Sequence, residues 1–395
     1  MFSNFMYYNP VKIIYGIDSI KQLPEEIKVF SHDNNAVTIV TDTGIVNAGI
    51  TEKILSILSE SGLKYSVFSE VESNPSFASV NKVVEIIKSN KSTCVIGLGG
   101  GSPIDVAKLA SVAASDNMPA ESYAFKRDIR IPPVQKEVNT IAIPTTAGTG
   151  AEVTQVGVYS DESKKKLWTV SFRLNPQTTI IDPTLTLGLP PKLTAATGLD
   201  ALVHAIEAIT GKPGNNPIVR SYGLQAIRLI CSSLERAINK GDDIEARANM
   251  ILSSTLAGMA IEAGNTAMAH GMGHALSSIA GIHHGRAVAL CLDAIYAWNA
   301  EAFPKVHAEI AKAMGIDPSG KTEMELAMAG AKEYSRLLSE SGISLSLKDD
   351  GLTISDLDRF VNSINAKENR GIVGYNRREP SDKDIIRFAR AVLER

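Results

Sequence analysis

The sequence predicts an α/β domain followed by a domain built only of helices. In the first half of the 395-residue chain, short apolar runs of strand length alternate with stretches of helical periodicity, which is typical of a parallel sheet. From about Pro191 to Arg395 only helical periodicity remains. This change of pattern places the boundary near residue 188. It predicts an N-terminal domain over residues 1–187 and a C-terminal domain over residues 188–395.

The apolar runs of the first half are bounded by turn-forming residues, as strands are. Strands are expected at residues 12–15, 36–40, 65–68, 94–97, 140–143 and 178–181, with a hairpin at 156–159 and 167–170 around a charged stretch. Helical periodicity lies between them, around residues 50–58 and 80–87. In the second half, helices are expected to be separated at residues 212–214, 317–320 and 348–351.

Composition and charge exclude several classes of function. A net charge of −3 offers no basic surface for nucleic acid or for a membrane. No apolar segment is long enough to span a membrane, and the N-terminus lacks the pattern of a secretory signal. Cys94, Cys231 and Cys291 are odd in number and far apart, so they predict neither a disulfide framework nor a CxxC metal site. These features together predict a soluble cytoplasmic protein.

Four of the seven histidines fall within the sixteen residues from His270 to Gly285. His270 and His274 are four apart, so on a helix they share one face. The Gly-Ile step before His283 predicts that this helix ends and that the chain turns back. Either His283 or His284 would then return towards the same point.

Asp200 and His204 repeat the one-turn spacing about seventy residues upstream, with a carboxylate and an imidazole. One carboxylate with several neutral imidazoles suits a divalent metal such as Zn²⁺ or Fe²⁺. The alternative is a set of separate polar or capping histidines. Two same-face pairs and a histidine doublet favour the metal, because buried ionisable groups need partners.

A glycine cluster at residues 97–101 lies where the 94–97 strand should pass into a helix. Glycines there allow positive φ and let backbone N–H groups approach an anion. Ser102 is expected to be the N-cap and Pro103 the first helical residue, so the positive end of the helix would face a diphosphate. The match to GxGxxG is imperfect because Ser102 stands in place of the third glycine, and a simple βα turn is the alternative.

Polar residues near the ends of other strands strengthen the dinucleotide interpretation. Asp42 follows the 36–40 strand and could accept hydrogen bonds from an adenosine ribose while repelling a 2′-phosphate, which favours NAD over NADP. Thr145, Thr146 and Thr149 lie along a second glycine-bearing turn and suit hydrogen bonds to a phosphate or to nicotinamide. Each of them could instead be a simple turn residue.

Together these segments resemble the iron-containing (group III) alcohol dehydrogenase family over nearly the whole chain. The resemblance rests on four ordered motifs, at residues 99–108, 144–154, 189–207 and 270–285. It implies a Rossmann-like NAD-binding domain, a helical metal-binding domain, and NAD and one Fe²⁺ or Zn²⁺ as cofactors. It also implies that the protein is a homo-oligomer. The implied activity is an alcohol dehydrogenase or aldehyde reductase, in which the metal acts as a Lewis acid on the oxygen of a small primary alcohol or aldehyde.

The resemblance also assigns roles to single residues. Its implied metal ligands are Asp200, His204, His270 and His284. His274 is implied to be a non-ligand histidine beside the nicotinamide that relays a proton. The implied cofactor contacts are Asp42, Gly99, Gly100, Gly101, Ser102, Asp105, Thr145, Thr146, Thr149 and Lys166. Two lysines adjacent to Lys166 leave the register of that contact open, and all three could form a solvated hairpin tip.

Departures from the family pattern fall near the expected substrate end of the site. His283 replaces a usual proline, Arg286 replaces a small apolar residue, and Ile261 lies in a segment that usually carries an aromatic residue. These three are candidate substrate residues. Arg286 with His283 raises the hypothesis of an anion-bearing aldehyde, such as a sulfonate or phosphonate of acetaldehyde, held by a charge-assisted contact. A surface arginine at a helix start is the alternative.

Two other functions remain open from the sequence. A dehydroquinate-synthase-like lyase would need several cationic side chains around the metal, and only Arg286 and Arg377 or Arg378 are candidates. A non-catalytic metal- and NAD-binding protein is the second, and the complete set of four ligand positions speaks against it.

Overall fold

The chain forms two compact units. The computed structural model describes residues 4–30, 36–161 and 166–395. One unit is Asn9–Gly188, and the other is Leu189–Arg395 together with the start of the chain up to Tyr8. The N-terminal segment is attached to the second unit by Tyr7, whose hydroxyl donates to the carbonyl of Met259 and whose ring packs against that of Tyr222.

The Asn9–Gly188 unit is built on a six-stranded, entirely parallel sheet in the order β1-β9-β6-β4-β2-β3. The strands are β1 (Lys12–Tyr15), β9 (Thr178–Ile181), β6 (Asn139–Pro144), β4 (Cys94–Gly99), β2 (Ala36–Val40) and β3 (Lys64–Phe68). All six were predicted, because parallel strands covered on both faces are nearly continuous apolar runs. Since the strands are parallel, the segments that follow β2, β4 and β6 leave the sheet side by side.

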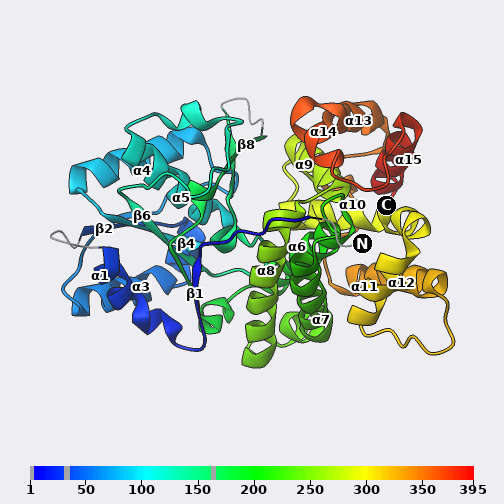
Figure 1. Cartoon of the computed structure of the whole chain (residues 1–395), viewed down its shortest axis with the longest axis horizontal. Helices are drawn as coiled ribbons and strands as arrows, with labels where there is room; N and C mark the ends of the chain where they lie inside the picture. The colour runs from blue at the N-terminus through cyan, green and yellow to red at the C-terminus, as the bar shows by residue number, and fades with distance from the viewer. Residues whose placement is uncertain (1–3, 31–35, 162–165) are drawn as a thin grey trace. The chain divides into compact units, whose positions relative to one another are not determined.

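Different helices cover the two faces of this sheet. They are α1 (Leu23–Phe30), α3 (Ile50–Glu60), α4 (Phe77–Asn90) and α5 (Gly101–Asp116). Ile39 packs in one apolar cluster with Ile54 of α3. The next residue of β2, Val40, packs in another cluster with Val83 of α4 and Leu109 of α5, as the two-residue period of a strand requires. Figure 1 shows α1 and α3 on one side of the sheet and α4 and α5 on the other.

A small second sheet completes this unit. It has the order β5-β8-β7, with β5 (Arg127–Asp128), β8 (Lys166–Ser171) and β7 (Val156–Ser160). Strands β7 and β8 are antiparallel, which confirms the predicted hairpin, and Ser160 pairs with Lys166 at the end where the chain passes from β7 to β8. Of the predicted hairpin tip at residues 161–166, residues 162–165 lie outside the described residues.

The second unit is helical, and no strand occurs among its described residues. Its helices are α6 (Pro191–Thr210), α7 (Pro217–Asn239), α8 (Ile244–Gly264), α9 (Met268–Ala280), α10 (His284–Ala302), α11 (Pro304–Ala313), α12 (Glu323–Glu340), α13 (Leu357–Asn365), α14 (Lys367–Val373) and α15 (Asp382–Leu393). Helix α6 is buried along nearly its whole length and packs against α7, α8 and α10. Apolar residues on most sides of this helix explain its central place, and the buried Asp200, His204 and Glu207 share one face of it. Across the described parts of the chain, every helix is too short or too polar to cross a membrane.

Candidate metal centre and cofactor site

Three helices of the second unit bring one carboxylate and four imidazoles together. Helix α6 carries Asp200 and His204 one turn apart, α9 carries His270 and His274 one turn apart, and α10 begins at His284. The helix end predicted between residues 280 and 283 is confirmed. Gly281 ends α9 in the left-handed conformation at φ 67°, which a residue without Cβ adopts at no cost.

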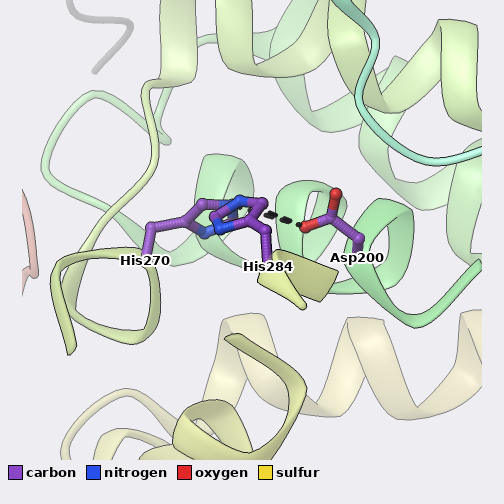
Figure 2. Close-up of side chains that lie close together, drawn as sticks. All are labelled: Asp200, His270 and His284. Carbon is purple, nitrogen blue, oxygen red and sulfur yellow. Dashed lines mark ion pairs between the residues drawn. The ribbon is translucent and has the colours of Figure 1, made fainter. Parts of the chain in front are cut away.

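The ligand atoms of Asp200, His270 and His284 all lie within 4.8 Å of one another. Nε2 of His270 and Nε2 of His284 are each 3.7 Å from Oδ1 of Asp200, and Figure 2 shows both imidazoles directed at that carboxylate. The ring of His204 stacks on the ring of His270 with 4.5 Å between centroids. Among the residues that the structure describes, the buried Nε2 of His270 has no hydrogen-bond partner. A divalent cation fits this donor set, since it would satisfy that atom.

The sequence left open whether His283 or His284 turns towards this cluster. His284 does so, because it opens α10 against Asp200, whereas His283 is exposed. His274 is half-buried at the edge of the cluster, with its ring centroid 5.1 Å from that of His284.

Glu207 is a residue of this site that the sequence analysis missed. It lies on α6 one turn beyond His204 and is 2% exposed. One carboxylate oxygen, Oε2, is 2.6 Å from Nδ1 of His270 and accepts a hydrogen bond from the backbone N–H of Ala267 at 2.9 Å. The other oxygen, Oε1, accepts from the N–H of Ala269 at 2.6 Å. The signal was present in the sequence, because Asp200, His204 and Glu207 share one face of a helix.

Helix α10 approaches α6 so closely at the ligands that only glycine fits at residue 285. A Cβ atom on Gly285 would lie 2.2 Å from the carbonyl oxygen of Ala196 and 3.2 Å from Cβ of Asp200. The glycine therefore allows the residue beside it, His284, to reach Asp200.

We expect Gly285→Ala to weaken metal binding about 10-fold and to lower the melting temperature, because the added methyl group must push the start of α10 away from α6. Overpacking of this kind costs about 1–3 kcal/mol, and about 1.4 kcal/mol is a factor of ten in affinity. Chelator competition and thermal unfolding measure the two effects. Gly371→Ala is the matched control, since nothing lies within 4 Å of a Cβ at that position. Equal metal affinity in both variants would contradict the close-approach argument.

The glycine loop of the first unit follows β4 and starts α5. Gly99 has φ 144°, a left-handed conformation that favours glycine, and Gly100 is the N-cap of α5. Cβ atoms on Gly100 and Gly101 would lie 3.4 Å from Oγ1 of Thr146 and 3.0 Å from Cγ2 of Thr149. The structure thus brings the two glycine-bearing turns together at the ends of neighbouring strands.

The prediction that Ser102 caps this helix is wrong. Helix α5 begins at Gly101 with Gly100 as its N-cap, so Pro103 is its third residue rather than its first. The hydroxyl of Ser102 donates to the carbonyl of Ser73 at 2.8 Å instead of capping the helix. The glycine at the cap has no side chain that could bond to the first N–H groups of the helix, which suits an anion.

Asp42 and Thr145 stand beside this loop. Oδ1 of Asp42 accepts from the N–H of Ile45 at 3.0 Å and caps the short helix α2 (Thr43–Asn47), which the sequence analysis did not predict. Oδ2 lies 3.4 Å from the position of a Cβ on Gly99. The N–H of Thr145 donates to the carbonyl of Gly99 at 2.9 Å. Among the described residues, the buried hydroxyl of Thr145 has no hydrogen-bond partner.

The surroundings of Asp105 favour a structural role over the cofactor contact expected from the sequence. Its Oδ2 accepts from the N–H of Val158 at 3.0 Å, and its Oδ1 is 3.3 Å from Nζ of the fully buried Lys108. Burial raises the pKa of Asp105, while the positive charge of Lys108 opposes that rise. Lys166 is the first residue of β8, half-buried at the end of the hairpin.

Of the candidate substrate residues, Arg286 has hydrogen-bond partners for each of its three nitrogens within the second unit. Its guanidinium makes two hydrogen bonds to Asp350, at 2.8 and 2.9 Å, and donates to the carbonyls of Ser344 and Ser346. These contacts fasten the segment before α13 to α10 and neutralise the charge that suggested an anionic substrate. Ile261 is half-buried and packs beside Val219 of α7.

Comparisons with known proteins point to one family over nearly the whole chain. Residues 10–183 match the family described as iron-containing alcohol dehydrogenase, and residues 194–393 match the C-terminal domain of the Fe-containing alcohol dehydrogenase family. The chain is 34% identical over 391 residues to 1,3-propanediol dehydrogenase of Citrobacter freundii, covering 98% of each chain. The solved structure of a 1,3-propanediol oxidoreductase matches with a TM-score of 0.92 at 31% identity, covering 99% of this chain and all of the other. Sulfoacetaldehyde reductase from Bifidobacterium kashiwanohense, in complex with NAD⁺, matches with a TM-score of 0.84 at 28% identity over 99% of each chain.

Proposed function

This chain belongs to the iron-containing alcohol dehydrogenase family, and we propose that its metal is Fe²⁺, held by Asp200, His204, His270 and His284. As a member of that family it is an NAD-dependent, metal-containing oxidoreductase that interconverts alcohols and aldehydes. The observation that carries the ligand proposal is the position of two imidazoles, those of His270 and His284, each with Nε2 at 3.7 Å from the buried carboxylate of Asp200. The donor set itself suits Fe²⁺ and Zn²⁺ alike, and the family supplies the preference for iron.

When bound, the metal supplies a Lewis acid at the substrate oxygen. Asp200 contributes one negative charge and neutral imidazoles contribute none, so the ligand set leaves a net positive charge that attracts a developing alkoxide. His274 is our candidate for proton transfer. It is half-buried, 5.1 Å from His284 between ring centroids, and can therefore exchange protons with solvent while standing beside the ligands.

We place the diphosphate of NAD at the start of α5. The support is a sixteen-residue helix whose N-cap glycine makes no side-chain hydrogen bond, with Thr146 and Thr149 beside it. Asp42, at the end of the neighbouring strand β2, is our candidate for the adenosine ribose, and its charge would repel a 2′-phosphate. Lys166 stays a prediction, as do a cytoplasmic location and a homo-oligomeric assembly.

For the substrate we propose a small, uncharged primary alcohol and its aldehyde. The 34% identity to a 1,3-propanediol dehydrogenase supports this class, and the partners of Arg286 remove the cation that had suggested an anion. An anion-bearing aldehyde is the second candidate, because a sulfoacetaldehyde reductase is among the similar structures.

We expect protein stripped of metal to be inactive and Fe²⁺ to restore NADH oxidation more fully than Zn²⁺. The assay would compare 3-hydroxypropanal with sulfoacetaldehyde, which are similar in size and differ in charge. A higher kcat/KM for the neutral aldehyde is expected, and the reverse ranking would favour the anionic class. Bound metal and NADH without net NADH consumption would instead point to a lyase or to a binding protein.

A further inference from the structure

The start of α9 is held by a side chain from another helix. Its N-cap residue, Ala267, provides no side-chain hydrogen bond to the first turn. Glu207 of α6 takes that place, since its two oxygens accept the N–H groups of Ala267 and Ala269. A buried carboxylate at a helix N-terminus is stabilised by these N–H groups and by the positive end of the helix. The backbone just before His270 is therefore anchored to the helix that carries Asp200 and His204.

The same carboxylate lies 2.6 Å from Nδ1 of His270. An ionised carboxylate has no proton to donate, so Nδ1 of His270 must carry the hydrogen of this contact. The neutral ring then has its lone pair on Nε2, the atom 3.7 Å from Asp200. Outer partners of this type orient a ligating imidazole and raise its basicity.

We propose that Glu207 is a positioning residue that selects the Nδ1–H tautomer of His270 and fixes the start of α9, so that Nε2 is ready to bind the metal. This inference rests on the proposed role of His270 as a ligand. Because Glu207 acts through His270, removing the charge of Glu207 should weaken metal binding. If Glu207 only stabilised the fold, it would not determine which nitrogen of His270 carries the hydrogen.

The test uses Glu207→Gln with Co²⁺ as the metal probe. A glutamine amide has only one oxygen, so it can accept either from Nδ1 of His270 and the N–H of Ala267 or from the N–H of Ala269. At least one buried N–H therefore loses its acceptor. We expect the Kd for Co²⁺ to rise about 10–100-fold, as is typical when the outer partner of a ligating histidine is lost. Glu26→Gln is the matched control, since Glu26 is also a buried carboxylate but pairs with Lys12 and Thr178 in the other unit. Its Kd for Co²⁺ should stay at the wild-type value.

A second measurement is made on the wild-type protein and therefore does not depend on whether Glu207→Gln folds. Two-dimensional NMR of the metal-free wild-type protein with ¹⁵N-labelled histidine reads the tautomer of each ring, and comparison with His270→Asn assigns the signal. We expect the Nδ1–H tautomer for His270, and the Nε2–H tautomer would overturn the proposal. An unchanged Kd for Co²⁺ in Glu207→Gln would also overturn the proposal for Glu207. If His270→Ala loses its metal at the same time, the ligand assignment still holds. Retention of metal by His270→Ala would instead refute the ligand set itself.

Discussion

His270→Ala should lose stoichiometric metal and lower kcat by at least about 1,000-fold. The effect should exceed the 10–100-fold that is typical for an outer partner, because the variant removes a ligand atom itself. It also removes the ring that stacks on His204, and it leaves the carboxylate of Glu207 without its imidazole partner. Metal analysis after dialysis and steady-state NADH oxidation measure the two expected losses.

The matched control for this variant is His307→Ala, which also removes a buried imidazole from the second unit. His307 is 2% exposed, its Nδ1 is 2.9 Å from the carbonyl oxygen of Phe303, and burial lowers its pKa to about 4. We expect this control to lose stability and to keep its metal. Full metal content and activity in His270→Ala would defeat the ligand assignment.

Asp42→Gly should shift the preference for NADH over NADPH towards NADPH by about 100-fold, which corresponds to about 2.7 kcal/mol. The carboxylate repels a 2′-phosphate and accepts from a ribose hydroxyl, so its removal should help one cofactor and harm the other. Asp42 also caps α2 through Ile45, but glycine is an acceptable N-cap that costs only a few tenths of a kcal/mol. The ratio of kcat/KM for the two cofactors, at a fixed aldehyde concentration, measures the shift.

Asp42→Asn separates the charge from the cap. Asparagine is as good an N-cap as aspartate and can still accept from Ile45, so α2 should be unaffected. A shift in the same direction is expected, because the repulsion of the 2′-phosphate is lost with the charge. If both variants keep the wild-type ratio, Asp42 is not part of the cofactor site.

Much of the fold could be read from local pattern. The strand at residues 36–40 and the helix end at Gly281 both match the sequence prediction, because a buried parallel strand and a glycine helix cap have short-range signatures. The same holds for the histidine spacing on α9 and for the Asp-His spacing on α6, since one helical turn brings residues i and i+4 to one face.

The misses share a different origin. Ser102 does not cap α5 because its hydroxyl bonds to Ser73, which is 29 residues away. Glu207 was overlooked because its partners lie about 60 residues further along the chain. In each case the partner that the polar side chain meets is far away in the sequence and is set by packing.

The sequence by itself determined the six strands of the main sheet, the helical character of the second unit, and the donor types available to a metal and a dinucleotide. Only the tertiary structure decided that His284 rather than His283 joins Asp200, that Glu207 holds His270, and that Arg286 is neutralised by Asp350. The physical reason is that periodicity and caps act within a few residues, whereas the choice of partner depends on how closely helices pack. The close packing of α10 on α6 at Gly285, for example, depends on the absence of a single Cβ atom.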